Sequence, residues 1–492
     1  MNDPAGTFCL VLHSHLPWLA HHGRWPVGEE WLYQSWAHAY LPVLDVVERL
    51  AAEGHRDLLT LGVTPVLAAQ LDDPHCLRGV HEWLDGWLLR AHGAAPRLPD
   101  LATYEHRAAT AALGLFESRW RHGASPVLRR LADAGALELL GGPATHPFAP
   151  MLLPEVRTFA LETGLTDATI RLGTRPVGIW APECGYAPGM EHGYASAGVR
   201  RFLVDGPALR GETALARPVG SSDVLAFGRD LEVTYRVWSP RSGYPGDRDY
   251  RDFHTFDHPS GLKPARVTGR SVPPENKRPY DPDRAAAAVA RDAADFASVV
   301  RERLVGLRER LGRAALTVAA FDTELFGHWW HEGPAWLEAV LRALPAAGVR
   351  VTTLRGAVAA GLIGGPVELP PSSWGSGKDW RVWAGEPVAD LVALNEGVQK
   401  ALLGAVAPTR ARDPLRDRLA QEALLALSSD WAFMVSKDSA AGYARERAYG
   451  HAARVEELAG QLTPDRRSTA DLWPPLPFGH IDARSLQRDR DT

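Results

Sequence analysis

Short apolar runs alternate with long helical patterns over roughly the first three quarters of the chain. The apolar runs are Thr7–Leu12, Leu58–Val63, Leu137–Leu140, Val177–Trp180, Phe202–Val204, Val233–Trp238, Leu316–Phe321 and Val349–Thr353. Strands that alternate with helices are typical of a parallel sheet with crossover helices. This number of strands favours a sheet that closes on itself. The pattern therefore predicts an α/β fold built on a closed or nearly closed barrel of seven or eight strands.

Three stretches depart from this repeat. Residues 74–131 are too long for one crossover helix and predict a helical insertion between the second and third strands. Residues 239–282 are rich in Gly, Pro, Arg and Asp, and an aperiodic loop of that length is typically functional or mobile. From residue 386 onward only helical patterns occur, which predicts an all-helical C-terminal domain over 386–492. The barrel itself is then expected to comprise residues 1–73 and 132–385.

Composition and charge narrow the possible partners. The 492 residues are 45% hydrophobic and 23% charged, as in globular proteins, and the net charge of −5 argues against nucleic acid as a partner. No apolar run is long enough to span a membrane, and the N-terminus does not resemble a secretory leader, so we expect a cytoplasmic protein without a membrane partner. The three cysteines show no CxxC spacing and predict no disulfide framework. These patterns do not specify an oligomeric state.

Tryptophan is unusually frequent. The chain has 17 Trp, against 13 Phe and 11 Tyr. A tryptophan offers a flat apolar face together with a polar edge, and such faces stack on nucleic-acid bases or on sugar rings. Since the net charge argues against nucleic acid, the excess of tryptophan favours a carbohydrate ligand.

Polar segments come directly after several of the predicted strands. They are residues 13–18, 141–147, 180–186, 205–206 and 321–330. In a parallel barrel the carboxyl ends of all strands lie at one face, so these segments are expected to meet there. The sequence therefore predicts a single polar site at that face.

Two carboxylates in these segments have apolar surroundings. Glu183 lies in the aromatic turn WAPECGY, and Asp322 directly follows the apolar run LTVAAF. Poor solvation raises the pKa of a carboxyl group, and a pair of carboxylates in an aromatic cleft is typical of glycosidic bond cleavage. Trp18, Trp180, Trp329 and Trp330 could then stack on sugar rings. Each acid could instead be a helix cap or an ion-pair partner. Periodicity also does not choose between Asp322 and Glu324, because residues i and i+2 of a strand share a face.

Three histidines allow a metal hypothesis. His13 and His15 can share one strand face, and His146 follows a neighbouring strand. Three histidines can bind zinc and leave one position open. Alternatively, they hydrogen-bond sugar hydroxyls or orient the carboxylates. We favour the second interpretation and expect no metal or other cofactor, because no carboxylate stands in the His-x-His motif and there is no His-Glu-x-x-His helix.

Five segments together resemble the ordered motifs of glycoside hydrolase family 57. They are HSHLPW (13–18), GGPATHPFAP (141–150), WAPECGY (180–186), FDTELFGHWW (321–330) and ALSSDWAFM (426–434). The resemblance implies a distorted seven-stranded (β/α) barrel with a helical C-terminal domain. It also implies a retaining double displacement without metal, with Glu183 as the nucleophile and Asp322 as the acid/base.

The same resemblance implies the substrate contacts. His13, His15 and His146 match positions that line the donor subsite, and Asp430 matches a position beside the acceptor path. The matched aromatic contacts are Trp180, Trp330 and Trp431. The loop from Ser239 resembles one that covers the cleft, and Tyr244 is the expected aromatic at its tip, where it would shield the glycosyl-enzyme from water.

Within the family, residues 373–383 and 426–434 are most similar to the 1,4-α-glucan branching enzymes. The sequence thus predicts an α-glucan transglycosylase, acting on an amylose-like or glycogen-like chain, with catalytic carboxyl groups about 5–5.5 Å apart. Three alternatives stay open: an α-amylase or 4-α-glucanotransferase on the same scaffold, a metal-dependent deacetylase or mannosidase that uses His13, His15 and Asp322, and a non-catalytic glucan-binding protein. One difference from the branching-enzyme pattern is that residues 389–392 contain no tryptophan pair.

Overall fold

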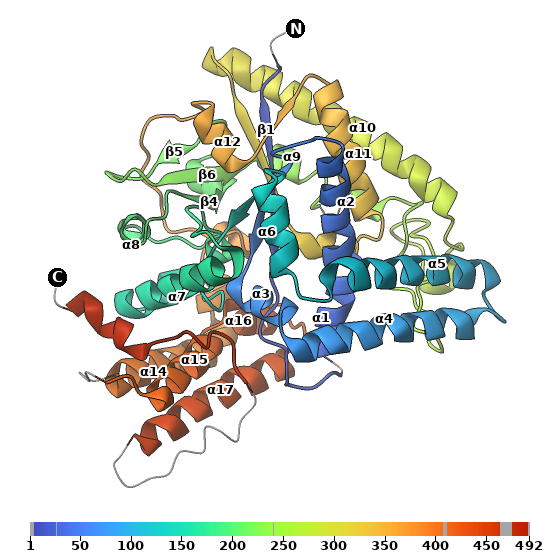
Figure 1. Cartoon of the computed structure of the whole chain (residues 1–492). Helices are drawn as coiled ribbons and strands as arrows, with labels where there is room; N and C mark the ends of the chain where they lie inside the picture. Colours follow the sequence, from blue (N-terminus) through green and yellow to red (C-terminus); the bar gives the residue numbers. More distant parts are fainter. Residues whose placement is uncertain (1–3, 26, 240, 407–410, 463–474, 491–492) are drawn as a thin grey trace.

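A parallel sheet forms the centre of the protein in this computed structural model, which describes residues 4–25, 27–239, 241–406, 411–462 and 475–490 (Figure 1). Four of its strands pair in the order β3–β2–β1–β7, all parallel. Their bounds are Thr7–Ser14 for β1, Leu59–Val63 for β2, Leu137–Leu140 for β3 and Leu316–Asp322 for β7. The short β8 (Arg350–Val351) also pairs with β1.

The sheet continues from β3 towards closure. Parallel bridges join Gly141 to Ile179 and Gly178 to Arg201. Strand β4 (Arg201–Asp205) then pairs in parallel with β6 (Leu225–Arg229), whose other neighbour is the short antiparallel β5 (Arg217–Pro218). The circle returns to β7 where the backbone N–H of Asp230 donates to the carbonyl of Val318 at 2.8 Å. Among the described residues, β1, β2, β3, the segment 178–179, β4, β6 and β7 thus form a distorted seven-membered barrel.

The side-chain alternation of β1 and β7 sets the inside of the barrel. Cys9 and Val11 pack with Val318 and Ala320 in an interior cluster, whereas neighbours such as Leu10 pack in the outer core. Continuing this alternation by one step places His13 and Asp322, which are paired in register, at the open end of the interior. The strand phase therefore delivers two polar side chains to the carboxyl face of the barrel.

Helices cover the outside of the barrel. The longest is α10 (Pro282–Leu311), capped by the side chain of Asp281 and ended by Gly312 in the left-handed conformation with φ 64°. The other helices of this part are α1 (Glu29–Ser35), α2 (Leu41–Ala52), α3 (Pro65–Leu71), α6 (Ser125–Asp133), α7 (Pro154–Leu172), α8 (Met190–Ser196), α9 (Leu231–Thr234), α11 (Gly333–Ala346), α12 (Leu354–Ala359) and α13 (Arg381–Ala384). No described helix is both long and apolar enough to cross a lipid bilayer.

Two further groups of helices lie outside the barrel. Helices α4 (Pro74–Ala94) and α5 (Pro99–Leu115) lie side by side within the predicted insertion (Figure 1). After the barrel come α14 (Ala389–Ala405), α15 (Pro414–Ala426), α16 (Ser429–Ser436) and α17 (Ala441–Gln461), which pack on one another. The helical content predicted for both regions is confirmed up to residue 462; residues 463–474 of the C-terminal prediction lie outside the described part. The boundaries of separate domains remain a prediction.

One predicted strand is wrong. The apolar pattern predicts an extended segment over residues 233–238, but α9 (Leu231–Thr234) and a turn occupy this stretch, and the strand is β6, just upstream. The cause is local: the side chain of Asp230 accepts hydrogen bonds from the backbone N–H groups of Glu232 and Val233 and so starts a helix.

The interior end of the barrel opposite to the polar face contains a buried ion pair. Arg201 donates to Glu138 at 2.6 Å, and Glu138 also accepts from the Thr60 hydroxyl and from the backbone N–H of Arg355. Both charged side chains are almost fully buried. A buried ion pair is costly to break because the remaining charge stays unsolvated.

We therefore expect the substitution Arg201→Ala to lower the free energy of unfolding by about 3 kcal/mol, measured by urea denaturation. The adjacent Arg200 is exposed, so Arg200→Ala is the matched control and should change this free energy by less than about 0.5 kcal/mol. Equal effects of the two substitutions would show that the pair with Glu138 does not stabilise the barrel.

Candidate active site

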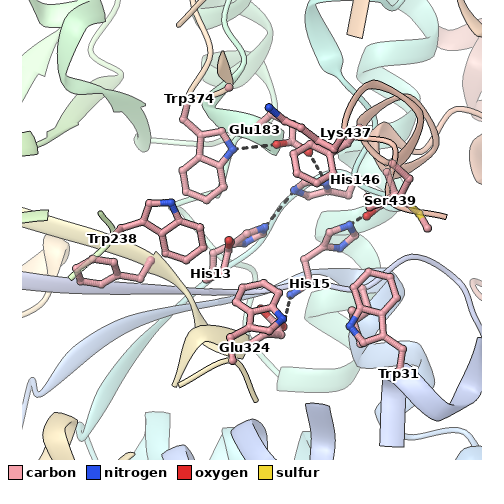
Figure 2. A pocket seen from close by; sticks show the side chains of 18 of the residues that line it. His13, His15, Trp31, His146, Glu183, Trp238, Glu324, Trp374, Lys437 and Ser439 are labelled. Carbon is pink, nitrogen blue, oxygen red and sulfur yellow. Dashed lines mark hydrogen bonds and ion pairs between the residues drawn. The ribbon is translucent and has the colours of Figure 1, made fainter. Parts of the chain in front are cut away.

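A cavity of about 960 Å³ opens at the carboxyl face of the barrel (Figure 2). Its lining includes Trp329, the alternative acid Glu324 and six polar residues predicted for the site, which are His13, His15, His146, Glu183, Asp322 and Asp430. They come from the ends of β1 and β7, from loops after β3 and after the segment 178–179, and from α16. The convergence predicted from strand phase is therefore present, and it includes a helix from the C-terminal region.

Glu183 is held in an uncommon backbone conformation. It has φ 61° and ψ 17°, and Cys184 has φ 50°, so two successive non-glycine residues lie in the left-handed region. Such conformations persist where the surroundings fix them and are frequent at functional sites. The buried carboxylate accepts a hydrogen bond from Ser429 Oγ at 2.8 Å on one oxygen and from Trp374 Nε1 at 2.9 Å on the other. Both carboxylate oxygens are thus oriented by donors.

Asp322 and Glu324 have different environments. The structure therefore distinguishes the two acids, between which sequence periodicity could not choose. Asp322 ends β7 and lines the cavity, and the interactions of its carboxyl group within the described residues are electrostatic, without a hydrogen bond. Glu324 lies in the following 3₁₀ turn, where it accepts from the Tyr40 hydroxyl and from the backbone N–H of His15. Asp322 is therefore available to a ligand, whereas Glu324 positions the end of β1.

Burial raises the pKa values of Glu183 and Asp322. The pKa of Glu183 rises to about 7, although the hydrogen bonds from Trp374 and Ser429 favour its ionised form. The pKa of Asp322 also rises to about 7, first through burial and then through the negative charge of Glu183. Because donors stabilise the anion only at Glu183, the pair at neutral pH is best described as an ionised Glu183 facing a protonated Asp322. The cavity thus holds one ionised and one protonated carboxyl group.

A chain of hydrogen bonds reaches Glu183 from the barrel (Figure 2). His13 Nε2 lies 3.1 Å from His146 Nε2, and His146 Nδ1 lies 2.9 Å from Ser429 Oγ. Ser429 must donate to the carboxylate of Glu183, so its oxygen accepts from His146 Nδ1, and His146 Nε2 then accepts from His13. This order requires one proton on each ring. Burial lowers the pKa of both histidines, which keeps them neutral.

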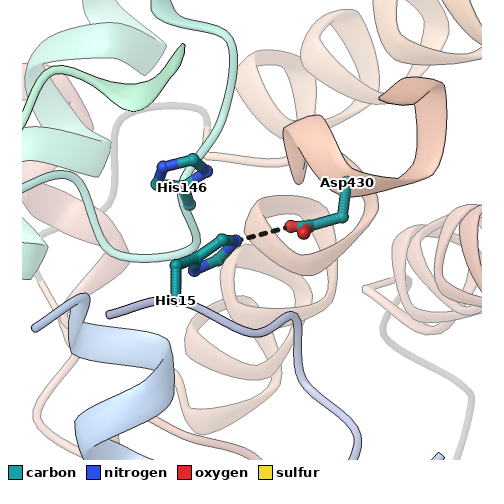
Figure 3. A group of neighbouring side chains, drawn as sticks. All are labelled: His15, His146 and Asp430. Atoms are coloured by element: carbon teal, nitrogen blue, oxygen red, sulfur yellow. Dashed lines mark hydrogen bonds and ion pairs between the residues drawn. The ribbon is translucent and has the colours of Figure 1, made fainter. Parts of the chain in front are cut away.

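His15, His146 and Asp430 form a group that could hold a metal ion (Figure 3). One ligand atom from each lies within 4.8 Å of the others, and two histidines with a carboxylate suit zinc. However, His15 Nε2 already bonds Asp430 at 2.8 Å and its Nδ1 bonds the Thr64 hydroxyl at 2.9 Å. Because both rings are also used in hydrogen bonds that orient the site, an ion would have to displace interactions that satisfy these groups without it.

The structure does not bring four of the predicted tryptophans to the cavity surface. Trp18, Trp180, Trp330 and Trp431 are each at most 3% exposed and do not line the cavity. The Trp180 ring stacks on His13 with centroids 4.3 Å apart and meets the edge of Trp374 at 4.9 Å. Their faces are used for packing, so the expectation that these rings stack on sugars is corrected: Trp180 supports His13 from behind.

Tyr244 is also displaced from its predicted position. Its hydroxyl donates to Asp295 on α10, and its ring packs near Phe296 and Trp336. It does not line the cavity. The aromatic residues of this part of the chain that do line it are Tyr235 and Trp238, which precede the predicted loop.

Several lining residues were not among the predicted contacts. They include Trp25, Trp31, Arg229, Trp238, Trp374 and Lys378. The guanidinium of Arg229 lies over the Trp374 ring at 5.2 Å, and both Arg229 and Lys378 form ion pairs with the buried Asp205. These contacts fix the indole that bonds Glu183. One indication of Trp374 is present in the sequence, because segment 373–383 resembles branching enzymes. That resemblance alone does not assign Trp374 a contact with Glu183.

Comparison with known proteins gives two family models along the chain. Residues 9–358 match the model described as glycosyl hydrolase family 57. Residues 392–483 match the model described as 1,4-alpha-glucan branching enzyme, C-terminal. Together they span the barrel, its insertion and most of the C-terminal helices.

Individual relatives cover nearly the whole chain. A probable 1,4-alpha-glucan branching enzyme of Mycobacterium tuberculosis is 60% identical, with 98% of each chain covered. The crystal structure of a family 57 branching enzyme from Thermococcus kodakaraensis, in complex with glucose and additives, matches with a TM-score of 0.90 and 30% identity, covering 93% of this chain and 90% of that one. The α-amylase AmyC from Thermotoga maritima matches with a TM-score of 0.85 and 27% identity, covering 98% and 99%.

The donor role of Ser429 can be tested directly. Ser429→Ala removes one hydrogen bond to the carboxylate, so we expect the pKa of Glu183 to rise further, by about one pH unit, in a carbon-13 NMR titration of labelled glutamate side chains. Ser436 lies on the same helix and bonds the carbonyl of Val382, so Ser436→Ala is the matched control and should leave this pKa unchanged. An unchanged or lower pKa in Ser429→Ala would contradict the assigned direction of the bond.

Proposed function

Because the chain belongs to glycoside hydrolase family 57, we propose that it is a 1,4-α-glucan branching enzyme, which cleaves an α-1,4 bond and transfers the fragment to a sugar 6-hydroxyl. One structural observation carries this proposal. Glu183 and Asp322 line a single aromatic cavity, and only Glu183 has donors that favour its anion. The match of residues 392–483 to a branching-enzyme C-terminal model supports this activity within the family.

The first half of the reaction uses the two carboxyl groups in opposite states. The ionised Glu183 attacks the anomeric carbon of the donor glucan, and the bond from that carbon to the glycosidic oxygen breaks. Asp322 donates its proton to the leaving oxygen, so that the released chain departs as a neutral alcohol. The products are a glycosyl ester on Glu183 and an ionised Asp322.

The second half returns both groups to their starting states. The ionised Asp322 takes the proton from the 6-hydroxyl of an acceptor glucan while that oxygen attacks the anomeric carbon. The ester bond to Glu183 breaks, and an α-1,6 bond forms with net retention of configuration. Water competes with the acceptor at this point, so the enclosure of the cavity decides between branching and hydrolysis.

The cavity walls suggest the substrate contacts. His13, His15 and His146 line the cavity and are proposed to contact sugar hydroxyls of the donor chain. Asp430, bonded to His15, is proposed to lie beside the acceptor path. We assign stacking on sugar rings to the tryptophans that line the cavity and not to the buried ones. The lining tryptophans are Trp25, Trp31, Trp238, Trp329 and Trp374.

The cellular setting of the proposed activity is the cytoplasm, and the proposed partner is an α-glucan chain. All three cysteines are buried and free, as is typical of a reducing compartment. An α-amylase or 4-α-glucanotransferase is the second candidate, because the T. maritima α-amylase AmyC shares the scaffold at a TM-score of 0.85. An assay with amylose separates these candidates from the metal-dependent and the purely binding alternatives.

The linkages formed from amylose test the activity. We expect the protein to produce α-1,6 linkages, detected as new chain ends after isoamylase digestion, with few new reducing ends. The substitution Glu183→Gln should lower the rate at least about 10³-fold because the nucleophile is lost, while amylose binding persists.

Each alternative gives a different result in this assay. Reducing ends without branches would identify an amylase, and 1,4-linked products alone a 4-α-glucanotransferase. Loss of activity after treatment with a chelator would favour a metal-dependent enzyme. Absence of any turnover by the unsubstituted protein would leave only glucan binding.

The raised pKa values predict a narrow pH profile. Activity should fall on the acid side as Glu183 becomes protonated and on the alkaline side as Asp322 loses its proton, with a maximum near pH 7. Measurement of kcat/KM against pH with amylose checks the two limbs. With α-maltosyl fluoride, whose leaving group needs no proton, the alkaline limb of the fluoride-release step should weaken. A profile that is flat between pH 5 and 9 would contradict the assigned roles.

A further inference from the structure

A second cavity, of about 400 Å³, adjoins the catalytic one. The two cavities share four lining residues, which are Trp25, Glu30, Gln34 and Trp329. None of the other residues of the second cavity lines the first. The two cavities therefore adjoin at these four residues, and the second cavity lies next to the one that contains Glu183 and Asp322.

The insertion and the long loop contribute most of the second cavity, and α1 and the segment after β7 complete it. Trp83, Trp87 and Arg90 of α4 form one side, and residues 251–263 of the long loop form another. Ion pairs hold these parts together: Arg251 bonds Glu105 of α5, and Arg97 bonds Asp257 at 2.7 Å. The insertion and the loop thus act as a preformed wall, which has no role in the chemistry of the carboxyl pair.

Aromatic faces of the second cavity are open to a ligand. Trp25 is 68% exposed and Phe256 is 44% exposed, whereas most large apolar side chains of this protein are buried. Phe253 and Trp329 are partly exposed beside them. Flat rings at the rim of a cavity are the surfaces on which sugar rings stack.

Polar groups of the cavity complement these faces. Among the described residues, the side chains of His38, His328 and Lys263 make no hydrogen bond, although all three line the cavity. The Lys263 Nζ lies 3.7 Å from the centroid of the Phe253 ring and 5.4 Å from that of Phe256. These donors and acceptors are available to hydroxyl groups of a ligand that rests on the rings.

The charge state of these groups favours an uncharged ligand. Burial lowers the pKa values of His38 and His328, so both rings are neutral at pH 7. Burial, together with the nearby Arg251, lowers the pKa of Lys263 to about 7. The acidic side chains of the cavity are paired as well, Glu105 with Arg251 and Asp252 with Lys277. Arg90 stays charged, but its guanidinium lies over the Trp83 ring, 4.7 Å from the centroid, and is attracted by the nearby Glu30 and Glu105. The positive charge of the cavity is thus balanced by its acidic side chains, and hydroxyl groups need only the neutral donors and acceptors that remain.

We infer that this second cavity binds the acceptor glucan chain. The 6-hydroxyl of that chain would reach the glycosyl-enzyme past Trp25 and Trp329, which line both cavities. The inference rests on the proposed branching function, which requires two chains. While the transferred fragment is bound to Glu183, the catalytic cavity is occupied, and the acceptor needs a separate approach. The second cavity is the adjoining space whose aromatic and neutral polar groups match a glucan.

The test uses residues that line only the second cavity. In the double variant Phe253→Ala/Phe256→Ala, the stacking faces are lost, and in Lys263→Gln the donor on the rings is replaced at similar length. Tyr449 is 43% exposed and lines neither cavity, so Tyr449→Ala is the matched control for loss of an exposed ring. Each variant is incubated with amylose, and α-1,6 linkages and new reducing ends are measured in the same sample.

We expect the double variant to form at least about tenfold fewer branches per reducing end released, because water reaches the glycosyl-enzyme when the acceptor is lost. Lys263→Gln should lower this ratio several-fold, and Tyr449→Ala should leave it unchanged. If the double variant does not fold, as judged by its thermal melting, Lys263→Gln decides the question alone.

The outcomes separate the two proposals. If the unsubstituted protein forms branches and both second-cavity variants keep its ratio, the acceptor site is refuted and the branching function stands. If branches and reducing ends fall together in folded variants, the cavity holds the donor chain and the acceptor assignment is wrong. If the unsubstituted protein forms no α-1,6 linkages, the branching function itself is refuted, together with the acceptor role.

Discussion

The site depends on the cost of burying an ionised carboxylate. Glu183 lies buried at the carboxyl face of the barrel, where burial raises its pKa and opposes ionisation. Its anion is maintained by two donors from outside the barrel, Ser429 on α16 and Trp374 in the segment after β8. Without these contacts the pKa of Glu183 would rise further, and its protonated form would be favoured at neutral pH. Helix α16 is thus part of the candidate site, and its docking on the barrel supports the ionised state that the proposed nucleophile needs.

The same constraint explains the order of the histidines. Ser429 must donate to Glu183, which leaves its oxygen to accept from His146, and His146 in turn accepts from His13. Each ring therefore carries one proton in a defined position, and the chain of hydrogen bonds has one direction from β1 to Glu183. A protonated His146 would carry a hydrogen on Nε2 and could no longer accept from His13, and a protonated His13 would bury an unpaired N–H at Nδ1. The low pKa that burial gives to both rings removes this conflict.

Periodicity and strand phase were sufficient to predict the features of the site that depend on the strands. The alternation in β1 and β7 places His13 and Asp322 inside the barrel end, and the polar loops converge because the strands are parallel. The orientation of large rings could not be predicted in this way. The sequence of the WAPECGY turn does not reveal that the Trp180 ring faces His13 and not the cavity. The strand expected at 233–238 is absent because a single side chain, Asp230, caps a helix there. Donors such as Trp374 come from 191 residues away in the chain, and their contact with Glu183 depends on tertiary packing alone.

In the proposed reaction, one part of the chain positions the carboxyl pair and another part influences whether a sugar or water accepts the transferred fragment. The barrel and α16 fix the carboxyl pair. In the proposed retaining reaction this pair serves hydrolysis and transfer equally well, because both would begin with the same glycosyl-enzyme. The choice between these outcomes depends on which oxygen next reaches the anomeric carbon. An acceptor held by its own contacts approaches as a bound neighbour, whereas water must diffuse in, and a well-oriented neighbour gains a large kinetic advantage. The insertion and the loop, which build the adjoining cavity without touching the carboxyl pair, are therefore the part of the chain in which a transferase and a hydrolase on this scaffold are expected to differ most.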